Sequence, residues 1–145
     1  MLIEREIEIE RPVEAVFDFV VDSRNDPRWC SKVQSVELLA GDGPGPGARY
    51  RVIHRPIPLR PARTLEVRCL AADRPGRIEW HEDDGVDTFD VVYEIEAAGP
   101  RRTRIRQRSD AELGTSRLMR PVIKWGIGAD LKRQLRALKT VLESG

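Results

Sequence analysis

The sequence predicts a single α+β domain, residues 1–145, in which an antiparallel sheet of about seven strands packs against one long C-terminal helix. Most of the chain alternates apolar and polar residues, as a half-buried strand does, and the breaks between these segments are short. The last thirty or so residues instead repeat apolar positions every three or four residues, which is typical of an amphipathic helix. A chain of 145 residues can bury a core without disulfides or a metal.

The N-terminal segments predict one strand and two short helices. Residues 2–10 place isoleucines on one face and glutamates on the other, which predicts a strand. In residues 11–22 the apolar spacing changes to i, i+3, i+4, i+7 after a proline, which predicts a short helix. Residues 23–31 interrupt that pattern, and we expect a second short helical turn there.

Six further segments alternate and are predicted as strands, namely 33–40, 48–55, 63–72, 77–82, 87–97 and 102–113. Their short glycine-, proline- or aspartate-containing connections favour an antiparallel meander. Thr115 or Ser116 is expected to cap the closing helix. The apolar stripe of that helix is expected to face the sheet and consists of Leu118, Val122, Trp125, Gly128, Leu131, Leu135, Leu138 and Leu142.

The composition narrows the function classes. With 25 basic and 24 acidic residues, the net charge of +1 gives no global attraction to nucleic acid or to an acidic membrane surface. Cys30 and Cys69 lie outside any CxxC spacing, which favours a reduced, cytoplasmic setting. No apolar run approaches the ~18 residues of a membrane span, so we expect no stable membrane insertion. No metal-ligand spacing or dinucleotide fingerprint occurs, and we expect neither a metal nor another cofactor.

The order of these elements resembles the START-like (SRPBCC) superfamily, and within it the polyketide cyclase/dehydrase-like group, over the whole chain. The resemblance is carried by IEIERPVEAVFDFVVD, by DPRW with Trp29, by the hairpin GDGPGPGARYRV and by the terminal LKRQLRALKTVLES. It implies the helix-grip fold, in which a curved sheet wraps round the C-terminal helix and encloses a cavity. It also implies that the last strand pairs with the first. This scaffold hosts many functions, so the resemblance is specific for fold and not for activity.

The segment RTRIRQRSD, residues 102–110, has an arginine at every second position. In the implied pairing this row lies between the glutamates of residues 2–10 and the acidic outward residues of 87–97. We therefore predict a cross-strand charge ladder, with about 0.2–1 kcal/mol for each pair. The rival interpretation is a basic patch for RNA or DNA, but acidic neighbours would cancel the local field that such binding needs.

The opposite faces of the strands are mostly apolar and aromatic with a few hydrogen-bonding groups, as in a small-molecule pocket. In the rival interpretation these aromatic residues are core, and the polar ones are satisfied by backbone or water. The expected ligand-binding residues are Tyr50, His54, Val67, Cys69, Trp80, Phe89, Val91, Tyr93, Ile105, Gln107, Ser109 and Trp125.

His54 is the candidate catalytic residue, because it is the inward side chain that titrates near neutral pH without help. It would act on an enolisable carbonyl with Tyr93, Gln107 or Ser109 nearby. Cys69 is expected to be an inert buried thiol. The glycine-rich loop 41–47 is either a lid beside the cavity or an ordinary surface loop. Gly126 and Gly128 leave space in the cavity or allow close packing.

The predicted function is binding of a hydrophobic small molecule of the polyketide, lipid or isoprenoid kind, in the cavity between sheet and helix. Three versions stay open: a polyketide cyclase/dehydrase-like enzyme, a lipid or quinone carrier, and a protein-interaction module acting on a chaperone or the ribosome. We expect a monomer or homodimer that does not bind nucleic acid. An active enzyme should lose turnover and keep binding when His54 is replaced by alanine, whereas a carrier should lose only some affinity.

Overall fold

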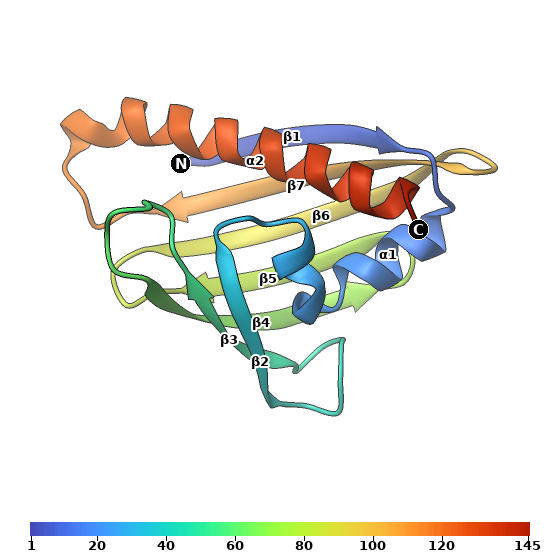
Figure 1. The fold of residues 1–145 in the computed structure, drawn as a ribbon, viewed down its shortest axis with the longest axis horizontal. Coiled ribbons are helices and arrows are strands. Elements are labelled where there is room, and N and C mark those ends of the chain that lie inside the picture. The colour runs from blue at the N-terminus through green and yellow to red at the C-terminus, as the bar shows by residue number, and fades with distance from the viewer.

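The computed structural model describes all residues, 1–145, and has the predicted order of elements (Figure 1). Seven strands form one antiparallel sheet in the order β1-β7-β6-β5-β4-β3-β2. The strands are β1 (Leu2–Ile9), β2 (Val33–Ala40), β3 (Arg49–His54), β4 (Arg63–Asp73), β5 (Arg77–Asp83), β6 (Thr88–Gly99) and β7 (Arg102–Glu112). The helices are α1 (Val13–Val20), the 3₁₀ helices η1 (Ser23–Arg28) and η2 (Arg117–Met119), and α2 (Arg120–Glu143).

Pairing of β1 with β7 brings the first and last strands together, as the family resemblance implies. Figure 1 shows α2 lying across one face of the sheet beside β1, with α1 and η1 on the same side. This inner face carries the core, a cluster of 22 buried residues that includes Leu135, Leu138 and Leu142 of α2. The helix-grip arrangement of the α+β fold is therefore present.

The apolar stripe predicted for the last helix is correct only in its second half. Leu131 and the three later leucines are buried, but Leu118, Val122 and Trp125 are 90%, 62% and 77% exposed. Figure 1 shows the first turns of α2 at the end of the sheet, where the strands stop. The prediction that Trp125 faces the cavity is wrong because helical periodicity cannot show where the sheet beneath the helix ends.

Two details of this helix answer questions left open by the sequence. Gly128 is buried against β1, where a Cβ would meet the end of the flexible Arg5 side chain and touch Ile3, so this glycine lies in the helix–strand contact and not at the cavity. Gly126 has open space round the position of a Cβ. Ser116 precedes η2, but its hydroxyl makes no capping hydrogen bond.

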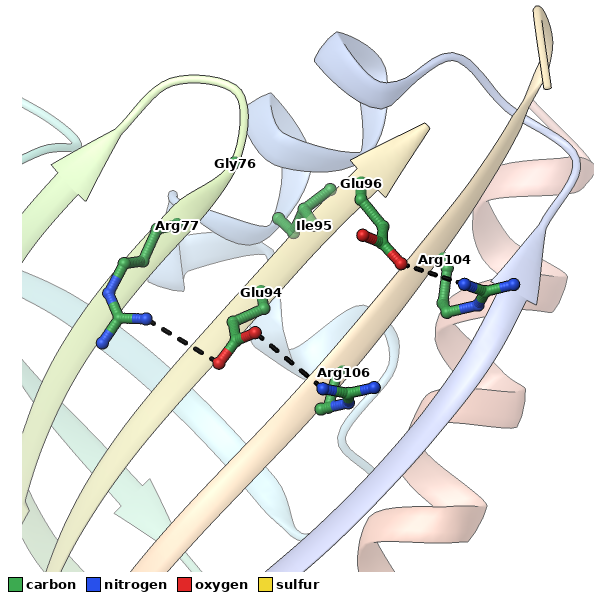
Figure 2. Close-up of a pocket in the computed structure, with 7 residues that line it drawn as sticks. All are labelled: Gly76, Arg77, Glu94, Ile95, Glu96, Arg104 and Arg106. Atoms are coloured by element: carbon green, nitrogen blue, oxygen red, sulfur yellow. Dashed lines mark hydrogen bonds and ion pairs between the residues drawn. The ribbon is translucent and has the colours of Figure 1, made fainter. Parts of the chain in front are cut away.

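The outer face of the sheet carries the predicted charge ladder. Arg104 contacts Glu8 at 3.1 Å and Glu96 at 2.9 Å, so one guanidinium links β1, β7 and β6. Arg106 pairs with Glu6 at 3.2 Å in the same way. Figure 2 shows the adjoining shallow hollow, in which every charged residue has an oppositely charged partner. Glutamates of the neighbouring strands thus neutralise the arginine row. We do not consider this hollow a candidate ligand-binding site.

Candidate functional site

A cavity of about 360 Å³ lies between the inner face of the sheet and α2. Strands β3 to β7 form its floor, and η1 and the first half of α2 form its walls. Fourteen of its 26 lining residues are hydrophobic. Both the volume and the mixture of apolar walls with a few polar groups are typical of a small-molecule site.

Seven of the twelve residues expected to bind ligand line this cavity. They are His54, Val67, Phe89, Val91, Tyr93, Gln107 and Ser109. Their strands alternate as predicted, so each side chain points to the inner face.

The other five expected residues do not line the cavity. Tyr50 and Trp80 are buried with their ring centroids 6.1 Å apart, and Cys69 and Ile105 are buried in the same core. Trp125 is exposed on the surface. Alternation correctly placed the first four on the inner face, but it cannot tell which inward positions are covered by core side chains and which face open space.

The glycine-rich loop 41–47 contributes no residue to the lining. It closes the β2–β3 hairpin, and the amide of Gly47 donates to the carbonyl of Cys69 at 3.1 Å. The β3–β4 connection contributes instead: Ile57 lines the cavity and is 51% exposed, so the cavity opens to solvent there. The interpretation of 41–47 as a lid is wrong, and it is a surface loop.

Gln107 carries an unpartnered oxygen on the cavity floor. Its side chain lies on β7 directly opposite Tyr93 of β6, and the residue is 5% exposed. Its Oε1 atom is buried and accepts no hydrogen bond. An unsatisfied buried acceptor of this kind costs about 1–3 kcal/mol. Gln107 is therefore an acceptor for which the chain supplies no donor.

Two carboxyl groups, Asp26 of η1 and Glu82 of β5, also line the cavity and face no cation. Burial raises the pKa of Asp26 to about 8, against the hydrogen bond that Ser23 Oγ donates to it at 2.8 Å and with a smaller contribution from the charge of Glu82. Burial also raises the pKa of Glu82 to about 7. Both groups can therefore change protonation state near neutral pH, as acid–base catalysts do.

The remaining charged residues of the lining have partners that hold them. Lys32 pairs with Asp130 of α2. Asp84 accepts from Arg63 at 3.1 Å and from the amides of Val86 and Asp87. These carboxylates are held by their partners within the chain. Asp26 and Glu82 are therefore the carboxyl groups of the lining that are free to act on a ligand.

His54 lies at the end of β3 and faces the cavity as expected. Burial, and secondarily the charge of Lys32, lower the pKa of its imidazole, so the ring is neutral at neutral pH. Cys30 also lines the cavity, and burial raises the pKa of its thiol well above the usual value. Cys69, off the cavity, has its pKa raised by burial to about 11, as expected for an inert thiol.

Sequence reasoning did not select Asp26 or Glu82 as functional residues. The alternation of β5 puts Glu82 on the same face as Trp80, so this signal was sufficient to select Glu82 as an inner-face residue. No periodic signal marks Asp26, because η1 is a 3₁₀ helix of only six residues, too short to show an amphipathic repeat. No three His, Cys, Asp or Glu side chains are grouped to hold a metal ion. None of the helices has the length and hydropathy needed to cross a membrane.

Residues 2–143 match the sequence model of a family described as polyketide cyclase / dehydrase and lipid transport. No curated protein matches the chain. Among solved structures, a START superfamily protein from Mycobacterium smegmatis is similar, with a TM-score of 0.84 and 18% identity over 99% of this chain and 97% of the other.

Two further structures share the fold. The ZhuI aromatase/cyclase from Streptomyces sp. R1128 has a TM-score of 0.81 and 14% identity, over 99% of this chain and 93% of that one. The protein TTHA0849 from Thermus thermophilus has a TM-score of 0.80 and 17% identity, over 99% and 98% of the two chains. At these identities the likeness establishes the fold and carries no activity across.

Proposed function

Because the chain belongs to the polyketide cyclase/dehydrase and lipid transport family, we propose that its cavity binds a mostly hydrophobic small molecule bearing hydroxyl or carbonyl groups. Polyketides, lipids and isoprenoids fit this description. The observation that carries the proposal is Gln107, whose buried Oε1 has no donor within the chain. A ligand hydroxyl or enol would supply that donor, while the apolar lining would receive the rest of the molecule.

Asp26 and Glu82 support an acid–base reaction on the bound molecule. With pKa values of about 8 and about 7, one carboxyl can hold a proton while the other is ionised at neutral pH. The ionised carboxylate would remove a proton from the carbon beside a carbonyl, and the protonated carboxyl would give its proton to the carbonyl oxygen. The resulting enol can attack a second carbonyl group of the same ligand molecule and close a ring. Loss of water from the ring then gives the dehydrated product. Neutral His54 is the other candidate base.

The carrier version of the function uses the same cavity and needs no proton transfer. Gln107 and the carboxyls would then only orient the ligand. The two versions differ in what happens when the acid–base groups are removed, so variants can separate them.

The first test is native mass spectrometry of the protein purified from its own host, which should detect a co-purifying apolar molecule. Affinity for that molecule should fall about tenfold in Gln107→Leu, the effect of one lost hydrogen bond. The matched control is Arg106→Gln, the next residue on the same strand, whose side chain is on the outer face. Equal affinity of Gln107→Leu and wild type would refute the assigned role of Gln107.

The second test separates enzyme from carrier. Asp26→Asn, Glu82→Gln and His54→Ala are each incubated with the identified molecule, and product formation is followed together with binding. An enzyme should lose turnover in at least one of the three while binding is kept. If the wild-type protein returns the molecule unchanged, the carrier version holds.

A further inference from the structure

Eight of the nine large apolar side chains exposed on this protein lie at one end of the molecule. Seven come from three segments and Leu2 from the start of β1: Leu118, Met119, Val122 and Trp125 from η2 and α2, Ile57 and Leu59 from the β3–β4 connection, and Val86 from the β5–β6 connection. The strand register places these three segments at the same sheet end, because Thr88 pairs with Glu112 and His54 pairs with Arg63. Figure 1 shows the same connections together on the left of the view. We call this surface the apolar rim.

The apolar rim surrounds the opening of the cavity. Each of its three segments also contributes residues to the cavity lining: Ile57 from the β3–β4 connection, Asp84 and Asp87 beside Val86, and Ile123 and Ile127 from α2. A molecule entering or leaving the cavity beside Ile57 therefore passes this rim.

The rim also carries unpaired positive charge. Arg117, Arg120 and Lys124 follow one another along η2 and α2, and residues 113–129 contain no Asp or Glu. Arg55 and Arg60 flank the apolar side chains of the β3–β4 connection. None of these five cations forms an ion pair, in contrast to the arginines of the outer face.

Three aspartates beside Val86 are hydrogen-bonded within the chain, whereas Glu112, which pairs with Thr88 at the same sheet end, forms no ion pair. Asp83 accepts from the amide of Gly85, and Asp87 accepts from the amide of Gly114. Asp84 is bonded to Arg63 and to two backbone amides, as described above. The five unpaired cations outnumber Asp83 and Glu112, the nearby carboxylates without an ion pair. Positive charge is therefore in local excess beside the exposed apolar side chains, although the net charge of the chain is only +1.

We propose that the apolar rim is a docking surface for an anionic lipid bilayer. A tryptophan and aliphatic side chains can enter the interfacial region of a bilayer, while neighbouring Lys and Arg contact lipid phosphates. Such binding is peripheral and needs no membrane-spanning helix. It places the opening of the cavity against the membrane.

A second copy of the chain fits the rim less well than a bilayer does. A symmetric dimer would bring the rim of one protomer onto the same surface of its partner. The cations of 113–129 would then face their own copies, and neither copy has a carboxylate in that segment to neutralise them. Like charges in such a contact are destabilising. The docking surface goes beyond the proposed function and does not depend on which molecule the cavity binds.

The test is binding to vesicles of phosphatidylcholine mixed with phosphatidylglycerol, compared with vesicles of phosphatidylcholine alone. The protein should float with the anionic vesicles only, and binding should weaken as salt rises. Tryptophan emission should shift to shorter wavelength on binding, because Trp125 leaves water. Trp29 and Trp80 are already buried and contribute little change.

Single variants locate the contact. Trp125→Ser should lower the vesicle partition coefficient about tenfold through lost apolar contact, and Lys124→Gln about fivefold through one lost charge. Leu70→Ser is the matched control, since Leu70 is the ninth exposed apolar side chain and lies on β4 away from the rim. All three positions are exposed, and circular dichroism confirms that each variant folds.

The proposal is overturned if the protein does not bind anionic vesicles, if it binds neutral vesicles equally well, or if Leu70→Ser weakens binding as much as Trp125→Ser. It is also overturned if sedimentation shows a dimer that Trp125→Ser dissociates. Gln107→Leu should bind vesicles like wild type, because its side chain is inside the cavity. Failure of vesicle binding is therefore distinguishable from failure of ligand binding.

Discussion

The two faces of β7 differ in how their polar groups are satisfied. On the outer face Arg104 and Arg106 contact carboxylates on both neighbouring strands. On the inner face Gln107 has an oxygen with no partner, and Asp26 and Glu82 across the cavity face no cation. The outer residues attract attention in the sequence, yet their partners show that they are part of the scaffold. A buried polar group that has no partner and also faces a cavity is the better indicator of a binding site, since the unpartnered Tyr50 hydroxyl lies in the core.

The largest effect expected from this difference is a pH dependence of stability caused by the inner carboxyls. The pKa of Glu82 is about 7 in the folded protein and near its ordinary 4.5 in the unfolded chain. Between these values the folded state holds a proton that the unfolded state releases, so the free energy of unfolding falls as pH rises. Glu82→Gln removes this pH-dependent loss of stability and should raise the free energy of unfolding at about pH 8 by on the order of 3 kcal/mol.

Urea unfolding of wild type and Glu82→Gln across the pH range measures this effect. The two proteins should be equally stable near about pH 4, where Glu82 is protonated in both states, and should diverge as pH rises. Parallel pH profiles would show that Glu82 ionises normally in the folded protein. Asp26→Asn should extend the divergence to higher pH, because the pKa of Asp26 is about 8.

A smaller gain is expected from Gln107→Leu in the empty protein. The substitution removes a buried acceptor that has no partner and replaces it with an apolar side chain of similar size. The free energy of unfolding should rise by about 1 kcal/mol in urea or thermal unfolding, although ligand affinity falls. A loss of stability of similar size would mean that the amide oxygen is satisfied in solution.

The smallest effect is expected on the outer face. Arg104→Gln breaks contacts to Glu8 and Glu96, but the Arg104 side chain is 41% exposed and its pairs are screened by solvent. The free energy of unfolding should fall only slightly at low salt and by less at high salt. A loss as large as the gain expected for Glu82→Gln would contradict the contrast between the two faces.

Most of the fold could be predicted from the sequence because alternation and helical spacing are local signals. Every strand end lies within two residues of its predicted position. The arginine ladder was predicted once the pairing of first and last strands was taken from the family resemblance. Strand phase also placed Gln107 and Tyr93 on the inner face.

The parts of the site that sequence reasoning missed depend on tertiary placement. Asp26 and Cys30 come from a turn without periodicity, and Ile57 from a proline-rich connection. Trp80 and Tyr50 have the correct phase but are covered by core side chains. Trp125 continues a helical stripe past the end of the sheet. Periodicity predicts the face on which a side chain lies. It does not predict whether that side chain contacts the core, a cavity or solvent.

The two halves of α2 contact different parts of the molecule. The second half packs in the core through Leu135, Leu138 and Leu142. The first half lines the cavity through Ile123 and Ile127. Substitutions in the first half can therefore change ligand and surface contacts while the second half keeps the helix on the sheet. Such a division lets a lineage acquire new binding specificity without first losing a folded protein. It offers a physical reason why structures with 14–18% identity to this chain retain its architecture over nearly the whole length.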